Sequence, residues 1–341
     1  MASLLSLLTG SALLIRRNLQ QASIDHQYSP SQWSNRLAKD GSKQFTTPDD
    51  VVFGEIKGNH VSTVSENSAL VRNRHSDTAD LHVEHEATRS KESTMDIYYQ
   101  QSRVATHAER NGDIVVYIHG GYWQALDKKS SCFFADTMLH KRNCSAFVAV
   151  GYDLCPTVPF RVLVHQVKSA VAHVLRSFPN HRIHVVGHSA GGHLGAELLL
   201  TNWSADFNIP EKKPASYCLV SGVYDLQPIY RSYVNEQCQM SEQEAIEFSP
   251  SLQSIQHITE RVSTTTDDTP PVPIIIAVGE HDSPAFRQQS RDFYTLLTKH
   301  TNAVVTFLEM PGEDHFTSIE RLDDEQYVLS ESIRVHLLMG V

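Results

Sequence analysis

One short segment constrains the fold of this chain more than any other. Residues 187–191 form a G-x-S-x-G motif, which stands between an apolar run at 182–189 and a helical pattern at 190–203. A serine in this context occupies a sharp, strained strand-to-helix turn, and small residues two positions away on each side let strand and helix approach each other. The segment therefore predicts Ser189 as a nucleophile, and a tight glycine-rich turn with an idle serine is the alternative.

From Met95 onward the chain alternates between two kinds of pattern. Short apolar runs predict strands at 95–99, 113–119, 145–154, 182–189, 216–222, 273–279 and 303–310, and helical periodicity predicts helices at 127–141, 159–178, 190–203, 284–299 and 318–339. Strands that are apolar throughout and alternate with helices are typical of a parallel sheet covered on both faces. We therefore expect an α/β fold with a mostly parallel sheet and helices on both faces.

A second motif follows the apolar run at 113–119 and consists of His119, Gly120, Gly121, Tyr122 and Trp123. Adjacent glycines let backbone N–H groups turn toward a substrate without obstruction by a Cβ atom, as an oxyanion hole requires. The predicted donors to the oxyanion are the N–H groups of Gly121 and Tyr122, together with that of Ala190, which begins the helix after Ser189.

The other side chains of this motif have predicted roles of their own. We expect His119 to be a structural hydrogen-bonding residue of the loop rather than a proton carrier. Tyr122 and Trp123 lie beside the predicted oxyanion hole, so we expect them to bind the substrate. The alternative is that both are core aromatic residues.

Candidate acid and base residues follow the last two predicted strands. Asp282 comes just after the strand at 273–279, and His315 lies after the strand at 303–310. We predict that His315 accepts the proton of Ser189 and that Asp282 orients His315. The order Ser, Asp, His along the chain is that of the α/β-hydrolase triad. Asp225 and Glu280 remain alternatives for the acid, whereas Asp314 is disfavoured because it is a sequence neighbour of the histidine.

Several segments together resemble the kynurenine formamidase (arylformamidase) family of α/β hydrolases. They are HQYSPSQW (26–33), HGGYWQ (119–124), GHSAGGHL (187–194), SGVYDLQPI (221–229), GEHDSPAFRQQSRDFY (279–294) and DHF (314–316). The resemblance implies hydrolysis of N-formyl-L-kynurenine to L-kynurenine and formate in tryptophan degradation. By motif it assigns the nucleophile to Ser189, the acid to Asp282, the base to His315 and the HGGxW loop to residues 119–123.

Two segments depart from the family pattern, at 55–92 and at 263–269. Both departures affect the expected substrate range, because such insertions can shape the entrance to a site. Two alternatives to a formamidase acting on a small aromatic formamide therefore remain. One is a carboxylesterase of broader specificity that uses the same machinery. The other is a catalytically inactive binding module with a hydrolase fold, which the complete triad and oxyanion loop disfavour.

Charge and composition limit the partners and cofactors. The formal net charge of −10 disfavours nucleic acid and anionic membranes as partners. The 19 histidines are scattered, with no HExxH motif and no Cys/His pair at zinc-ligand spacing, so we expect no metal site. The predicted chemistry requires no cofactor. The sequence does not define an oligomeric state, and a homodimer is compatible with it.

The cysteines and the first residues bear on the cellular compartment. The five cysteines are an odd number without CxxC pairs, which favours reduced thiols in the cytoplasm. Residues 1–20 form an apolar leader in which Arg16 and Arg17 follow the apolar run. This order is the reverse of a secretory signal, and the run is too short to span a bilayer. We expect a cytoplasmic protein, with a nuclear pool also compatible, and organelle targeting by residues 1–17 is the less favoured alternative.

The domain organisation follows from these patterns. We expect the leader at 1–20 to lie outside the fold and residues 21–341 to form one α/β-hydrolase catalytic domain. Within that domain, the stretch at 39–92 is polar and poor in large apolar residues. We therefore expect this stretch to form loops or a flap rather than core.

Overall fold

The computed structural model describes residues 27–28, 59–65, 71–73, 93–100, 112–128, 134–135, 137–141, 144–210, 213–263 and 270–338. The predicted leader at 1–20, much of the polar stretch at 39–92 and the departing segment at 264–269 lie outside these residues.

The strands of the described residues form one sheet in the order β2-β1-β3-β5-β4-β6-β7-β8-β9. They are β1 (Asn59–Ser65), β2 (Val71–Asn73), β3 (Thr94–Gln100), β4 (Asp113–Ile118), β5 (Ala146–Val150), β6 (Arg182–His188), β7 (Ser216–Val220), β8 (Pro273–Gly279) and β9 (Val304–Met310). Every pair from β5 across to β9 is parallel, whereas β2, β1 and β3 are antiparallel to their neighbours. The prediction of a mostly parallel sheet is confirmed.

The antiparallel edge includes part of the stretch at 39–92, which was expected to form loops or a flap. Strands β1 and β2 lie within this stretch, and β1 pairs with the whole of β3. The polar composition of the stretch hid them, although the valines and threonine of β1 favour an extended backbone. Without β1, the backbone N–H and C=O groups along one edge of β3 would lack partners. Pairing in the folded protein therefore decides the structure of this segment.

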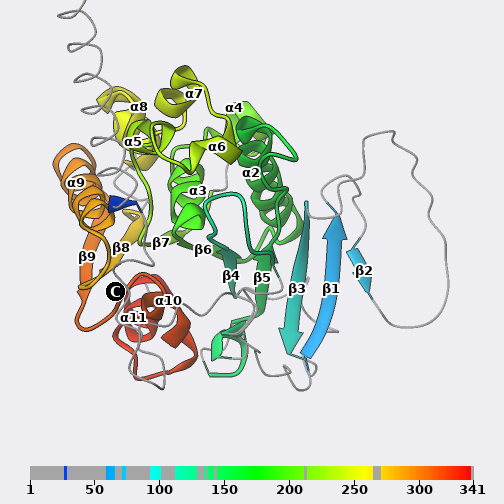
Figure 1. Cartoon of the computed structure of the whole chain (residues 1–341). Coiled ribbons are helices and arrows are strands. Elements are labelled where there is room, and N and C mark those ends of the chain that lie inside the picture. The colour runs from blue at the N-terminus through cyan, green and yellow to red at the C-terminus, as the bar shows by residue number, and fades with distance from the viewer. Residues whose placement is uncertain are drawn as a thin grey trace, which may run out of the picture.

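Helices cover both faces of the sheet, as predicted (Figure 1). They are η5 (Thr137–Lys141), α2 (Phe160–Ser177), α3 (Ala190–Leu199), α4 (Trp203–Phe207), α5 (Gln227–Tyr230), α6 (Asn235–Cys238), α7 (Glu242–Glu247), η6 (Pro250–Leu252), α8 (Ile255–Val262), α9 (Pro284–His300), α10 (Thr317–Glu320), η7 (Arg321–Asp323), α11 (Val328–Ser332) and η8 (Ile333–Leu338). In Figure 1, α2, α3 and α9 lie on one side of the sheet and α10 and α11 on the other. None of the helices described is long and apolar enough to cross a membrane.

The side chains of each central strand alternate between two cores. In β4, Ile114, Val116 and Ile118 pack in the core that α2 and α3 cover. Val115 and Tyr117 pack on the opposite face, in the core that includes residues of η5 and α11. Successive side chains of a strand point to opposite faces, so a strand that is covered on both faces must be apolar throughout. This burial explains the continuous apolar runs in the sequence.

The C-terminal segment differs from its prediction, because the helix expected at 318–339 is broken into α10, η7, α11 and η8. The break lies at Asp324, whose carboxylate accepts the N–H of Gln326 at 2.9 Å. Tyr327 then donates its hydroxyl to the carbonyl oxygen of Ser318 at 3.0 Å. These bonds stabilise a turn in place of the next helical turn.

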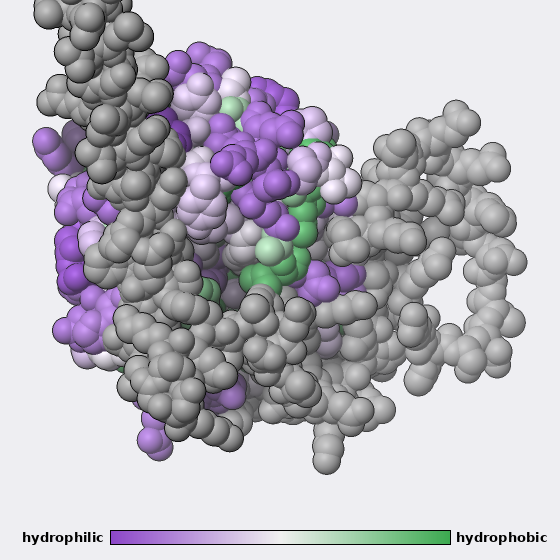
Figure 2. Space-filling model, in the orientation of Figure 1, coloured by the Kyte–Doolittle hydropathy of each residue, from purple (hydrophilic) through white to green (hydrophobic). Residues whose placement is uncertain are grey.

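Between β7 and β8 the chain forms the short helices α5–α8, which the sequence analysis did not predict. The signal for α7 was present as a capping box, in which Ser241 and Glu244 bond to each other's backbone N–H groups. Figure 2 shows a mainly hydrophilic surface over α7, at the top of the view. Helices this short depend on tertiary packing for their stability, and Ile258 and Val262 of α8 are buried in the core.

Candidate active site

Ser189 occupies the sharp turn between β6 and α3, with φ 57° and ψ −117°. Its backbone N–H donates to the carbonyl oxygen of Val220 at 2.8 Å. A Cβ on Gly187 would lie 2.1 Å from the carbonyl oxygen of Gly191, and a Cβ on Gly191 would lie 2.0 Å from that of Ile118. The two glycines of the motif are therefore a steric requirement of the turn that presents the serine.

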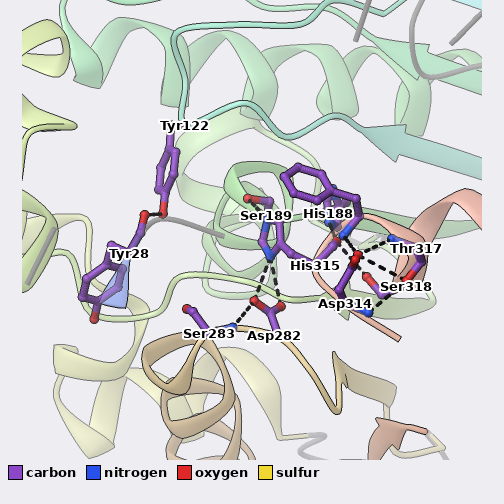
Figure 3. Close-up of polar contacts among 11 residues, drawn as sticks. Tyr28, Tyr122, His188, Ser189, Asp282, Ser283, Asp314, His315, Thr317 and Ser318 are labelled. Carbon is purple, nitrogen blue, oxygen red and sulfur yellow. Dashed lines mark hydrogen bonds and ion pairs between the residues drawn. The ribbon is translucent and has the colours of Figure 1, made fainter. Parts of the chain in front are cut away.

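The structure brings His315 and Asp282 to Ser189 from the ends of two other strands (Figure 3). The His315 Nε2 lies 3.0 Å from the Ser189 Oγ. On the other side of the ring, Nδ1 lies 2.9 Å from Asp282 Oδ2 and 3.2 Å from Oδ1. All three residues are buried, at 3% exposure or less. The contacts form a continuous chain from carboxylate to imidazole to hydroxyl, as proton transfer from the serine requires.

The backbone holds the Asp282 carboxylate in this orientation. Asp282 follows β8, and its N–H donates to the carbonyl oxygen of Gly279 at 3.1 Å. Its Oδ1 accepts the N–H of Ser283 at 2.7 Å, which leaves Oδ2 directed at His315. A carboxylate that accepts both a backbone N–H and an imidazole N–H has little freedom to rotate.

The alternative acids bond to nearby backbone instead of to His315. The Asp225 carboxylate accepts the N–H of Gln227 at 2.9 Å. The Glu280 carboxylate accepts the N–H of Gly312 at 2.8 Å. Asp314 accepts the N–H groups of the two residues after His315, which stabilises the histidine loop. Each of these carboxylates therefore stabilises a turn, and Asp282 is the acid in contact with the imidazole.

The loop after β4 passes directly over the serine turn. A Cβ on Gly120 would lie 3.0 Å from the Cβ of Ser189, so glycine permits this approach. Gly121, Tyr122 and Trp123 all have positive φ, at 99°, 50° and 59°. Among the described residues, the N–H groups of Gly121, Tyr122 and Ala190 bond to no backbone acceptor. Three unpaired donors on the two segments that meet at the serine suit the binding of an oxyanion.

His119 and Tyr152 support this loop from beneath. The His119 Nδ1–H donates to the carbonyl oxygen of Gly120 at 2.9 Å, and its ring stacks on Tyr152 with centroids 4.3 Å apart. The Tyr152 hydroxyl donates to the carbonyl oxygen of His119 at 3.0 Å. Burial lowers the pKa of His119 to about 4, so the ring is neutral near pH 7. These contacts fit a structural residue rather than a proton carrier.

His188 is a site residue that the sequence analysis missed. Its Nε2–H donates to the backbone carbonyl oxygen of His315 at 2.8 Å, and the two ring centroids lie 4.8 Å apart. Burial lowers the pKa of His188 to about 3, so the ring stays neutral and keeps this hydrogen bond. The only sequence signal was its place beside Ser189, because the contact joins residues far apart in the chain.

Trp123 packs in the core beneath the oxyanion loop. Its side chain is fully buried in the core, with its ring centroid 5.1 Å from those of Phe160 and His193. The positive φ of Trp123 turns the backbone so that the indole points into the protein. This burial favours the core-aromatic alternative, and contact between Trp123 and substrate stays a prediction.

Tyr122 stands beside the triad, partly buried. Its hydroxyl donates to the backbone carbonyl oxygen of Tyr28 at 2.5 Å (Figure 3). Its ring faces Phe286, with centroids 6.3 Å apart, and Phe286 in turn lies 4.6 Å from the ring of His315. Tyr28 is a second residue near the site that the sequence analysis left without a role. Tyr122, Phe286 and Tyr28 together form an apolar wall beside the base.

The described residues contain no group of three or more His, Cys, Asp or Glu side chains that could hold a metal ion. The Ser189 hydroxyl contacts the His315 imidazole, which contacts the Asp282 carboxylate, and backbone N–H groups lie on the segments that meet at the serine. This set suits nucleophilic attack by a serine on a carbonyl carbon, with the N–H groups binding the oxyanion that forms.

Comparisons with known proteins bear on the family and the fold. A family model for the alpha/beta hydrolase fold matches residues 115–318, more than half of the chain. The chain is 35% identical over 316 residues to the kynurenine formamidase of Salmo salar, covering 92% of this chain and 96% of that protein. It is 34% identical to the kynurenine formamidase of Danio rerio, again covering 92% of this chain and 96% of that protein. Among solved structures, esterase B of Lactobacillus rhamnosis matches with a TM-score of 0.57 at 14% identity, covering 97% of this chain and 94% of that one.

Proposed function

The chain belongs to the kynurenine formamidase family of α/β hydrolases, and we propose that Ser189, His315 and Asp282 carry out its reaction, the hydrolysis of N-formyl-L-kynurenine to L-kynurenine and formate. The reaction is a step of tryptophan degradation. The observation that carries the assignment of residues is the chain of contacts from Asp282 through His315 to the Ser189 hydroxyl.

In the first half of the reaction, the Ser189 Oγ attacks the formyl carbon as His315 Nε2 takes the hydroxyl proton. The carbonyl oxygen becomes an oxyanion, which the N–H groups of Gly121, Tyr122 and Ala190 bind. Asp282 keeps the proton on Nδ1 of His315 and stabilises the imidazolium. The C–N bond then breaks, and the imidazolium returns its proton to the departing aromatic amine.

In the second half, water hydrolyses the formyl-serine. His315 removes a proton from the water as its oxygen attacks the formyl carbon, and the same N–H groups bind the second oxyanion. The bond to the Ser189 Oγ breaks, the serine recovers a proton from His315, and formate leaves. The formyl group is the smallest acyl group, and an arylamine is weakly basic, so both ease the cleavage of this amide.

The test compares the wild-type protein with Ser189→Ala on N-formyl-L-kynurenine. We expect the wild type to release L-kynurenine and formate in equal amounts and the variant to lose about 10³-fold or more in kcat, the scale of triad deletions in other serine hydrolases. The variant should keep the wild-type circular dichroism spectrum. Substantial turnover by a folded Ser189→Ala protein would exclude the serine mechanism.

The two alternatives have their own readouts. A catalytically inactive binding module would not react with a fluorophosphonate probe, whereas we expect the probe to label Ser189. A broader carboxylesterase would cleave butyrate or longer esters faster than it cleaves N-formyl-L-kynurenine. We expect the opposite order, with kcat/KM for the formamide above that for p-nitrophenyl acetate and a steep fall with acyl length.

We also propose that the enzyme works in the cytoplasm, that residues 21–341 are one catalytic domain and that the leader at 1–20 is dispensable. Support for the compartment comes from the odd number of cysteines and from Cys155, Cys218 and Cys238, which are buried cysteines outside any disulfide. Cell fractionation tests the location, and light scattering tests whether the enzyme is a homodimer.

A further inference from the structure

We infer that Tyr28 is a positioning residue of the oxyanion hole, acting through Tyr122. The inference rests on the proposed role of the Tyr122 N–H as an oxyanion donor. Tyr28 is separated from Tyr122 by 94 positions in the sequence, and the two meet through one hydrogen bond, from the Tyr122 hydroxyl to the Tyr28 carbonyl oxygen.

Tyr28 is itself fixed in place by its side chain. The residue is 5% exposed, and its ring packs against Phe286 with centroids 6.0 Å apart. The Gln289 Nε2 donates to the Tyr28 hydroxyl at 2.6 Å. Two independent contacts, one apolar and one polar, therefore hold the side chain and with it the backbone carbonyl that Tyr122 uses.

Gln289 connects Tyr28 to a third loop of the site. Its Oε1 accepts the N–H groups of Tyr224 at 2.6 Å and Asp225 at 2.8 Å, in the segment after β7. Gln289 and Phe286 both lie on α9, which begins just after Asp282. Tyr28 therefore joins the oxyanion loop to the helix that follows the catalytic acid, and Gln289 extends this connection to the loop after β7.

The backbone of Tyr122 needs such an anchor. Its φ of 50° lies in the left-handed region, which a residue with a bulky side chain adopts only when its surroundings hold it there. The direction of the Tyr122 N–H depends on this conformation. When the hydroxyl is bonded to Tyr28, the ring cannot swing toward a conformation with negative φ.

This arrangement predicts a specific kinetic signature. An oxyanion donor acts on the transition state and hardly on the bound substrate, so a displaced donor lowers kcat and leaves KM nearly unchanged. The effect must be the same for a formamide and an ester, because both form an oxyanion. A residue that instead contacts the aromatic leaving group would change KM, and only for the aromatic formamide.

The experiment measures kcat and KM for Tyr28→Ala, Tyr28→Phe and Tyr122→Phe on N-formyl-L-kynurenine and on p-nitrophenyl acetate. For Tyr28→Ala and Tyr122→Phe we expect kcat to fall about tenfold on both substrates, less than the loss for complete removal of a donor. We expect KM to stay within about twofold. Tyr28→Phe keeps the ring contact and the backbone carbonyl, so we expect it to restore most of the lost kcat.

The double variant Tyr28→Ala with Tyr122→Phe tests whether the two residues act through one link. We expect it to lose no more kcat than either single variant, because Tyr122→Phe removes the hydrogen bond whose acceptor Tyr28→Ala leaves without its anchor. Tyr217→Phe is the matched control, since it removes another buried tyrosine hydroxyl that bonds to a backbone carbonyl, that of Leu198. The control should keep wild-type kcat.

Independent, multiplicative losses in the double variant would overturn the inference, as would a folded Tyr28→Ala protein with unchanged kcat or with altered KM for the formamide alone. If Tyr28→Ala does not fold, Tyr122→Phe decides the question, because it removes the hydrogen bond and keeps both rings. If the wild type fails to hydrolyse N-formyl-L-kynurenine, the proposed substrate is wrong, and the ester kinetics still test Tyr28.

Discussion

Replacing Asp282 with asparagine tests the acid of the triad more sharply than its removal would. The Asp282 Oδ1 accepts the N–H of Ser283 at 2.7 Å, so the amide oxygen of the variant must take this position. The amide nitrogen then stands where Oδ2 stands now, 2.9 Å from Nδ1 of His315. Because an amide nitrogen only donates, His315 must accept at Nδ1 and carry its proton on Nε2.

A proton on Nε2 of His315 blocks the activation of Ser189. The Nε2 of His315 lies 3.0 Å from the Ser189 Oγ, and once protonated it cannot take the serine proton. The same change of tautomer in a serine protease lowers kcat by about 10⁴-fold. At about 1.4 kcal/mol per factor of ten, this loss corresponds to about 5.5 kcal/mol of activation free energy. The fold should persist, because the amide fills the same volume.

The assay is steady-state hydrolysis of N-formyl-L-kynurenine by Asp282→Asn, with Asp225→Asn as the control. Among the described residues, the Asp225 carboxylate bonds to the N–H of Gln227 and not to His315. Its variant should therefore stay within about threefold of wild-type kcat, as expected for a change outside the triad. Urea unfolding should show both variants folded. More than a tenth of wild-type kcat in Asp282→Asn, or a larger loss in Asp225→Asn, would refute the assignment.

Three further predictions concern the scaffold. Gly191→Ala should prevent the protein from folding, because the new Cβ would lie 2.0 Å from the carbonyl oxygen of Ile118. Active enzyme in the soluble fraction would contradict this steric argument. Trp123→Ala should lower the free energy of unfolding by about 3–5 kcal/mol, as for other buried aromatic residues. In the folded fraction, the substitution should reduce formamide and ester turnover equally. Urea unfolding should show lower stability at pH 5 than at pH 7. Burial lowers the pKa of His119 to about 4 and that of His188 to about 3 in the folded protein, whereas the pKa of a histidine in the unfolded chain is near 6.5. The unfolded chain therefore binds protons first as the pH falls. The contribution of these two histidines to the free energy of unfolding is complete above pH 6.5, and below this pH it decreases by about 1.4 kcal/mol per pH unit for each histidine. Equal stability at the two pH values would contradict the burial of the two rings.

Features that depend on local geometry were predictable from the sequence. The turn at Ser189 needs glycines at fixed offsets, and the strands of the parallel sheet are apolar throughout because both faces are covered. The order of Ser189, Asp282 and His315 along the chain then suggested which loops meet. The sequence predicted Asp282 as the acid but left Asp225 and Glu280 as alternatives, since all three follow strands of the same sheet.

Only the tertiary structure decided the features that depend on contacts between distant segments. Tyr122 and Trp123 are adjacent aromatic residues, yet one faces the triad and the other the core, because consecutive positive φ values turn their side chains apart. Strands β1 and β2 exist because β3 offers an edge for pairing, which their polar sequence does not reveal. His188 and Tyr28 act through backbone carbonyl groups, which every residue has and which no sequence pattern marks. Local steric requirements depend on residues that are adjacent in the sequence. These contacts instead arise only when the folded chain brings remote backbone and side-chain groups within hydrogen-bonding distance.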